Sequence, residues 1–229
     1  MIYAELAQKM QRHLGSVAAL LALLHLSSCS TYCITPTQSE ESEANVSCLT
    51  FTQFANCSRN LQSDTTLILQ PGNYTLDVEI SIFNIPEFSL LGSASTASPS
   101  NFTVQCENQA KFSFEAVNSV FIYGLSFVGC GDNIFSRVDQ LTINDTIFCG
   151  TEESHTAIVL KKTTATVISS IFVSNKNGRL ENQTFTRVGG AIIATINSNV
   201  SVYGSMFQNN SADYGGAIYT ELGLSLIHI

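Results

Sequence analysis

The chain repeats one pattern of hydrophobic and polar positions four times between residues 117 and 210. In each repeat, two apolar residues stand seven and five positions before a phenylalanine, with one residue between them. The phenylalanines are Phe127, Phe148, Phe172 and Phe207, separated by 21, 24 and 35 residues. Alternation at period two predicts short strands whose side chains point alternately to a core and to solvent. A repeat of twenty-odd residues predicts three such strands and three turns, which is one coil of a solenoid.

The predicted fold is therefore all-β: a right-handed parallel β-helix, a single-stranded β-solenoid of roughly seven coils over residues 61–223. The sequence GGAI occurs at 189–192 and again at 215–218. Glycine pairs at that spacing indicate coil corners, where φ is positive or two backbones approach closely. Asn175 and Asn210 each follow a phenylalanine by three residues, and we expect them to bond the backbone of a neighbouring coil at equivalent turns.

The N-terminal part predicts a leader and a cap. Lys9 and Arg12 precede an apolar run, 14–26, and small residues, so residues 1–30 are interpreted as a secretory signal peptide cleaved after Ser30. A buried helix or membrane anchor, and a lipoprotein signal ending at Cys29, are the alternatives. Residues 31–60 form a cysteine-containing cap, in which a short amphipathic helix over 49–60 covers the first sheet edge.

The C-terminal residues 224–229 (LSLIHI) do not continue the coil pattern. We interpret them as a non-native tail, with a short last strand as the alternative. Natural solenoids cap their open sheet edges, so we expect the native protein to continue, and a membrane anchor in that part stays open.

Composition narrows the function classes. With 45% hydrophobic residues, 12% charged residues and a net charge of -8, the chain is too apolar to be disordered and too acidic to coat nucleic acid. Eight N-x-S/T sequons, more than chance gives, favour a glycoprotein that is secreted or exposed on the extracellular face of the cell. The sequon asparagines are Asn45, Asn56, Asn73, Asn101, Asn144, Asn182, Asn199 and Asn209.

Six cysteines remain after the predicted leader, an even number that indicates disulfides in an oxidising compartment. The disulfide candidates are Cys33, Cys48, Cys57, Cys106, Cys130 and Cys149. Cys106 and Cys130 lie 24 residues apart, about one coil, and are predicted to bridge adjacent coils. Free buried thiols are the competing interpretation.

Three carboxylates are weak candidates for catalysis. Asp132 and Glu153 each follow a phenylalanine by five residues and are predicted to be neighbours on adjacent coils, with Asp145 nearby in sequence. Paired carboxylates are what a β-helix glycosidase or lyase needs, whereas solvated turn residues are the simpler interpretation. No metal or cofactor site is predicted.

The GGAI motifs and the F-x-x-N motifs at 172–175 and 207–210 resemble the repeats of chlamydial polymorphic membrane proteins, which are surface autotransporter adhesins. The longer pattern CLTFTQFANCS, LQPGNYTL, FTVQC and VFIYGLSFVGCG is similar to secreted right-handed β-helix proteins of invertebrate animals. These resemblances imply a non-catalytic secreted or cell-surface glycoprotein that uses its β-helix for recognition or adhesion, with an extracellular protein or glycan as partner. The alternatives are a β-helix carbohydrate-active enzyme, a polysaccharide lyase or hydrolase, and the passenger of a bacterial outer-membrane autotransporter.

Overall fold

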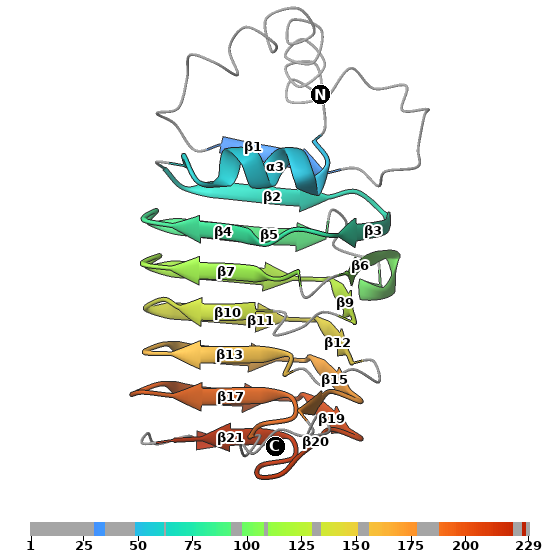
Figure 1. Ribbon diagram of the computed structural model, residues 1–229, viewed down its shortest axis with the longest axis vertical. Coiled ribbons are helices and arrows are strands. Elements are labelled where there is room, and N and C mark those ends of the chain that lie inside the picture. Colours follow the sequence, from blue (N-terminus) through green and yellow to red (C-terminus); the bar gives the residue numbers. More distant parts are fainter. Residues whose placement is uncertain are drawn as a thin grey trace, which may run out of the picture.

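The computed structural model describes residues 30–34, 49–61, 63–92, 98–107, 110–129, 134–150, 156–177, 188–221 and 226–227. These residues form a right-handed parallel β-helix with a small helical cap, as the sequence predicts (Figure 1). Each coil passes in turn through three parallel sheets, here named A, B and C. Equivalent strands of successive coils are hydrogen-bonded neighbours, so the coils stack along one axis.

Sheet A has eight strands: β1 (Ser30–Ile34), β2 (Thr65–Leu69), β5 (Glu87–Gly92), β8 (Ser119–Tyr123), β11 (Gln140–Asn144), β14 (Thr164–Ile168), β18 (Asn199–Tyr203) and β22 (Leu226–Ile227). Sheet B has six: β3 (Gly72–Leu76), β6 (Phe102–Cys106), β9 (Ser126–Val128), β12 (Ile147–Cys149), β15 (Ile171–Val173) and β19 (Met206–Gln208). Sheet C has six: β4 (Ile80–Phe83), β7 (Phe112–Glu115), β10 (Ile134–Arg137), β13 (Ile158–Lys161), β17 (Ile192–Thr195) and β21 (Ile218–Thr220).

Three smaller elements lie outside the three sheets, in addition to the capping helix described below. A 3-10 turn, η1 (Pro99–Asn101), leads into β6, and two short strands, β16 (Lys176–Asn177) and β20 (Ser211–Ala212), pair beside sheet B's last coils. The described strands make six coils of three strands each, and β22 opens a further one. β22 pairs Leu226 with Ser201 and Ile227 with Val202, which is the geometry of a short last strand.

Phenylalanine rings stacked on one another form a continuous rung through the core. Phe127, Phe148, Phe172 and Phe207 are register partners on adjacent strands of sheet B. Their ring centroids lie 5.2, 4.9 and 4.7 Å apart in order, with nearly parallel planes. The first three rings are fully buried. The repeated pattern in the sequence is thus one residue ladder, as predicted, and the alternating apolar pairs ahead of it form the inner face of sheet A.

The corners of the coils are held by polar ladders. The Asn175 amide donates through Nδ2 to the Phe148 carbonyl at 3.1 Å, and the Asn175 backbone N–H donates to Asn210 Oδ1 at 2.9 Å. Asn210 Nδ2 in turn donates to the Phe172 carbonyl at 2.9 Å. The predicted backbone-bonding role of these asparagines is confirmed, and it explains why each of them stands three residues after its phenylalanine, Phe172 or Phe207.

A second ladder, which sequence analysis missed, lies at the corner between sheets A and B. The backbone N–H of Thr146 donates to Ser170 Oγ at 3.3 Å, and that of Ser170 donates to Ser205 Oγ at 3.0 Å. Each of these hydroxyls also donates to the carbonyl two residues before it. The signal was present, because a hydroxyl residue precedes three of the four phenylalanines by two positions.

The GGAI corners need glycine for two different reasons. Gly189 and Gly215 have φ of 64° and 62°, in the left-handed region that favours glycine. Gly190 is needed for space, since a Cβ there would lie 2.0 Å from the backbone oxygen of Gly216 on the next coil. The prediction that these motifs are coil corners is confirmed.

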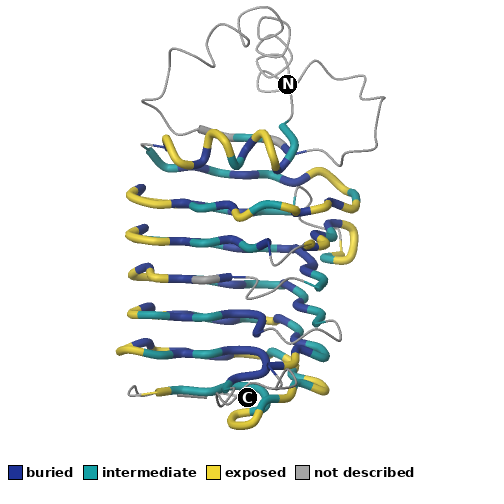
Figure 2. Tube along the Cα trace, viewed as in Figure 1, coloured by how far each residue is buried: buried dark blue, intermediate teal, exposed yellow. Residues whose placement is uncertain are grey.

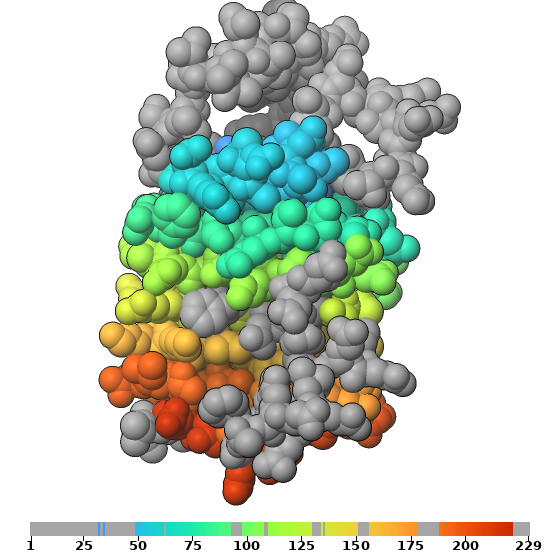
Figure 3. Space-filling view, viewed as in Figure 1, coloured from blue at the N-terminus to red at the C-terminus, as the bar shows by residue number. Residues whose placement is uncertain are grey.

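The cap covers the first coil with one helix and one strand. The helix α3 (Phe51–Ser58) begins at Thr50, whose side chain accepts from Gln53 N–H while the Gln53 side chain accepts from Thr50 N–H. Buried Phe51 makes edge-to-face contacts with Tyr74 and Phe112, which fixes α3 over sheets B and C. β1 extends sheet A beside β2. Figure 3 shows α3 lying across the end of the stacked coils.

We expect Phe172→Ala to lower the free energy of unfolding by about 3–5 kcal/mol, because it empties a fully enclosed position in the aromatic rung. The matched variant Phe207→Ala removes the same side chain from the half-buried end of the rung and should cost about 1–2 kcal/mol. Urea denaturation followed by far-UV circular dichroism measures both. Equal losses would show that the rung does not carry the stability of the core.

Candidate functional site

The three sheets present three outward faces, and the predicted glycosylation sites are distributed unevenly among them. Sheet A carries Asn144 at the end of β11 and Asn199 at the start of β18. Sheet B carries Asn73 in β3, with Asn101 just before β6 and Asn209 just after β19. No sequon asparagine lies in any of the six described strands of sheet C.

The side chains of these asparagines are accessible where the structure describes them. Asn56 (in α3), Asn73, Asn101, Asn199 and Asn209 are exposed, and Asn144 is partly exposed. Asn45 and Asn182 lie outside the described residues. Accessibility is what glycosylation requires, and whether the sites are modified stays a prediction.

The outward faces also differ in chemistry. On sheet A the central strands present hydroxyl, amide and aromatic side chains, including the stacked pair Phe121 and Tyr123. On sheet B the last strands present apolar side chains, among them Ile147, Ile171 and Met206, which is 48% exposed. Sheet C differs from both because it presents charged groups in register on adjacent strands.

Sheet C is the column of arrows on the left of Figure 1. We use the name C face for its outward-pointing side chains. One row of the C face crosses five strands at equivalent positions, about 4.8 Å apart. In order along the axis, this row contains Phe83, Glu115, Arg137, Lys161 and Thr195. Figure 2 shows that exposed residues recur at the neighbouring corner of every coil, where sheet C turns into sheet A.

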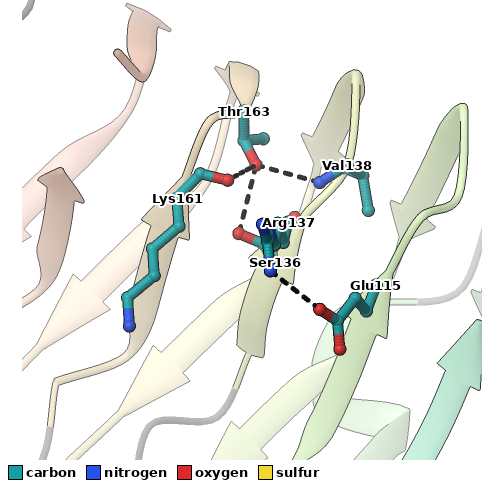
Figure 4. A network of polar contacts seen from close by, with 6 residues as sticks. All are labelled: Glu115, Ser136, Arg137, Val138, Lys161 and Thr163. Atoms are coloured by element: carbon teal, nitrogen blue, oxygen red, sulfur yellow. Dashed lines mark hydrogen bonds and ion pairs between the residues drawn. The ribbon is translucent and has the colours of Figure 1, made fainter. Parts of the chain in front are cut away.

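Arg137 and Glu115 form an exposed ion pair in this row. Arg137 Nη1 lies 3.0 Å from Glu115 Oε1, and the two side chains are 50% and 57% exposed (Figure 4). An exposed pair of this kind contributes at most about 1 kcal/mol, because water and salt screen it. Lys161 occupies the next position along the row, and Lys162 follows in the exposed turn with φ of 53°.

The backbone beneath these cations is fixed from inside the coil. Thr163 is buried, and its Oγ1 accepts a hydrogen bond from Val138 N–H at 3.1 Å. The same hydroxyl lies 3.1 Å from the carbonyl oxygens of Ser136 and Lys161, to which it donates (Figure 4). Thr163 therefore ties β10 to β13 next to Arg137 and Lys161, so the two cations are carried on a rigid support.

The carboxylates proposed for catalysis are not brought together in the part of the chain that the structure describes. Asp145 sits in the turn after β11, where its φ is 48° and its N–H donates to the Ile168 carbonyl. Asp132 and Glu153 lie outside the described residues. Among described residues, no group of three or more His, Cys, Asp or Glu side chains is placed to hold a metal ion.

The cysteines only partly follow the prediction. Cys57 and Cys149 carry free thiols in this structure, so it pairs neither of these two disulfide candidates. Cys149 points outward from sheet B with Val128 and Val173 as its register neighbours, and Cys57 lies on the exposed side of α3. Cys106 is disulfide-bonded. Cys48, Cys130 and the side chain of Cys33 lie outside the described residues.

Sequence analysis missed the charged row of the C face. Glu115, Arg137 and Lys161 are 22 and 24 residues apart, so their coil spacing was available, but no motif distinguishes them from ordinary solvated charges. Only the strand register places them side by side.

Comparison with known proteins finds no matching family model, no matching curated protein and no matching solved structure. No described helix is long and apolar enough to cross a bilayer. A proposal about function therefore depends on the surface of this molecule.

We expect Thr163→Val to lower the free energy of unfolding by about 1–3 kcal/mol, because the buried Val138 N–H loses its acceptor while the shape of the side chain is kept. Thr163→Ser retains the hydroxyl and should lose less than half as much. Chemical denaturation of the two variants tests this. If valine were tolerated as well as serine, the hydroxyl would not anchor this corner.

Proposed function

We propose that this protein is a non-catalytic, secreted or cell-surface glycoprotein whose β-helix recognises an extracellular ligand through the C face. The observation that carries the proposal is the distribution of sequons: the outward faces of sheets A and B carry them or border on them, and the described strands of sheet C carry none. An N-linked glycan is bulky and hydrated, so it protects the surface around it. The face whose described strands carry no sequon is the one left open to a macromolecular partner.

The geometry of the C face supports this proposal. Each strand of sheet C is hydrogen-bonded to a neighbouring strand on both sides, except the terminal strands β4 and β21. The backbone that carries these side chains is therefore rigid. A rigid surface loses little conformational entropy when it binds, and this favours recognition by a long flat face. The face presents charged, hydroxyl, aliphatic and aromatic groups together, as polar protein interfaces do.

Export through an oxidising compartment is supported by Cys106, which is disulfide-bonded. The register pairs Gln105 with Val128, so continuing it by one residue brings Cys106 level with Gly129, the neighbour of Cys130 in the chain. We infer that Cys130 is its partner and that this bond joins adjacent coils at the corner after sheet B.

The first test adds a glycan to the C face. Ile193→Asn creates the sequon Asn-Ala-Thr on β17, because Thr195 is already in place. Thr164→Asn creates the same tripeptide on β14 in sheet A, because Thr166 is already in place, and serves as the matched control. Both proteins are secreted from animal cells, and glycan occupancy is verified by mass spectrometry.

Binding to surfaces coated with reconstituted basement membrane is then compared by biolayer interferometry. We expect the glycan at position 193 to weaken saturable binding at least tenfold and the glycan at position 164 to change it less than twofold. Equal effects of the two glycans would contradict the assignment to the C face, and the absence of saturable binding by the unmodified protein would contradict the proposal of matrix recognition.

The second test concerns the disulfide. Peptide mapping without reduction is expected to yield one peptide pair that joins Cys106 to Cys130, while Cys149 is labelled by iodoacetamide before unfolding. Recovery of Cys106 as a free thiol in the secreted protein would show that the predicted coil-to-coil bridge is absent.

A further inference from the structure

One row of side chains on sheet A is largely apolar, although it lies on the outer surface of the molecule. Six adjacent strands, from β2 to β18, each contribute one outward side chain to it, and the strand register places these side chains next to one another. In order along the axis they are Ile68, Leu91, Tyr123, Asn144, Ile168 and Tyr203. All six are at least partly exposed. We call them the apolar row.

The other outward rows of sheet A are polar. The row beside the apolar row carries hydroxyl side chains at five of its six positions: Thr66, Ser89, Phe121, Thr142, Thr166 and Ser201. The row beyond it contains Glu87, Ser119, Gln140, Thr164 and Asn199. The apolar row is therefore a stripe with polar groups along one side. A contiguous apolar stripe on an outer surface is typical of a place that another group covers.

Asn144, a sequon asparagine, occupies a central position in the apolar row. Its register partners are Tyr123 on β8 and Ile168 on β14, each about 4.8 Å away across the sheet. Leu91 and Tyr203 lie one strand further on either side. Alternation along β11 points the Asn144 side chain outward, and it is partly exposed. A glycan bonded to its amide nitrogen therefore begins between an aromatic ring and an aliphatic side chain.

Tyr123 belongs to an aromatic pair that suits a sugar ring. Phe121 and Tyr123 both point outward from β8, with ring centroids 6.2 Å apart and ring planes within 9° of parallel. Phe121 is level with Thr142, so the pair runs beside the strand that carries Asn144. The C–H groups on one face of a pyranose ring carry partial positive charge, which is attracted to the negative face of an aromatic ring. Such packing also removes apolar surface of both rings from water.

From this geometry we infer that the first sugar of an N-linked glycan on Asn144 packs on the ring of Tyr123, and that this glycan covers the apolar row. The ligand of the site is an N-acetylglucosamine residue attached to the same chain. The glycan is then part of the folded structure and stabilises it. The inference rests on the proposed glycosylation of the protein, and it does not depend on the role of the C face.

The other sequon asparagines within described strands have different neighbours. Asn73 on β3 has Thr103 as its register partner, and Asn199 on β18 has Thr164. Glycans at these two positions start next to a threonine and gain no aromatic contact from a register partner. Asn199 lies on the same sheet as Asn144 and is exposed, so it provides a matched control.

A double-mutant cycle tests whether the sugar and the ring stabilise the fold together. The full chain is secreted from animal cells that attach only high-mannose glycans, and endoglycosidase H trims each glycan to one N-acetylglucosamine. Asn144→Gln should lower the folding equilibrium constant about three- to tenfold when Tyr123 is present. In the Tyr123→Ala background the same change should have less than a twofold effect. Urea unfolding measures the constants, and peptide mapping verifies glycan occupancy.

Two further measurements keep the test independent of how well the variants fold. Asn199→Gln should have the same effect with and without Tyr123→Ala, and coupling equal to that of Asn144→Gln would overturn the inference. In the unmutated, trimmed protein, NMR of isotope-labelled sugar should show ring protons of the N-acetylglucosamine on Asn144 shifted upfield of those on Asn199. Such a shift reports a sugar that lies over the face of an aromatic ring. Identical shifts at the two sites would contradict the contact with Tyr123.

The outcomes separate this inference from the proposal on which it rests. If Asn144 carries no glycan while other sequons are occupied, the inference fails and the glycoprotein proposal stands. If no sequon of the secreted chain is occupied, both fail. A glycan on Asn144 that is not coupled to Tyr123 overturns the inference alone. Self-association of the fully glycosylated chain that Ile168→Ser abolishes would also overturn it, because a second copy of the chain would then cover the apolar row.

Discussion

In-register pairing of equivalent residues on successive coils is the interaction on which the rest of this structure depends. In the three sheets, the backbone of each inner strand pairs with the equivalent strands of the coils above and below, and side chains at equivalent positions are thereby stacked. The rung of Phe127, Phe148 and Phe172 and the asparagine pair at the corner are both products of that register. A coil that lost its register would lose the aromatic contacts and the corner hydrogen bonds together, so the fold is cooperative along its axis.

The same register determines what the surface can do. Side chains alternate across a strand, so each ladder on the inner face is accompanied by a ladder on the outer face. On sheet C the outer ladder brings together Glu115, Arg137 and Lys161 from three separate repeats. The buried hydroxyl of Thr163 links the strands beneath them. The core and the outward row of sheet C are therefore two sides of the same strands, and a mutation in the core would displace the outward row as well.

Sequons and charged side chains are distributed differently over the outer surface. The sequons of the described strands lie on sheets A and B, whose exposed groups are hydroxyls, amides and apolar side chains. Protecting these faces with glycans would also limit the association of their apolar and aromatic residues with other molecules. The described strands of sheet C carry charged side chains and no sequon asparagine.

The sequence by itself determined the solenoid, because coil closure demands an apolar pair, an aromatic and a corner residue at fixed steps. This spacing of apolar pair and phenylalanine occurs four times in the sequence, and in the last two repeats a corner asparagine, Asn175 or Asn210, follows. It also determined the capping helix, through Thr50, Gln53 and the apolar side of 49–60. The charged row was decided only by the tertiary structure. Its residues recur at coil spacing but share no chemical type, so no sequence motif links Glu115 to Arg137. Strand pairing brings Arg137 Nη1 to 3.0 Å from Glu115 Oε1. Inward positions repeat the same residue types because packing in the core constrains them, whereas outward positions are free to differ. Which outward side chains are neighbours is therefore known only once the fold has set the strand register.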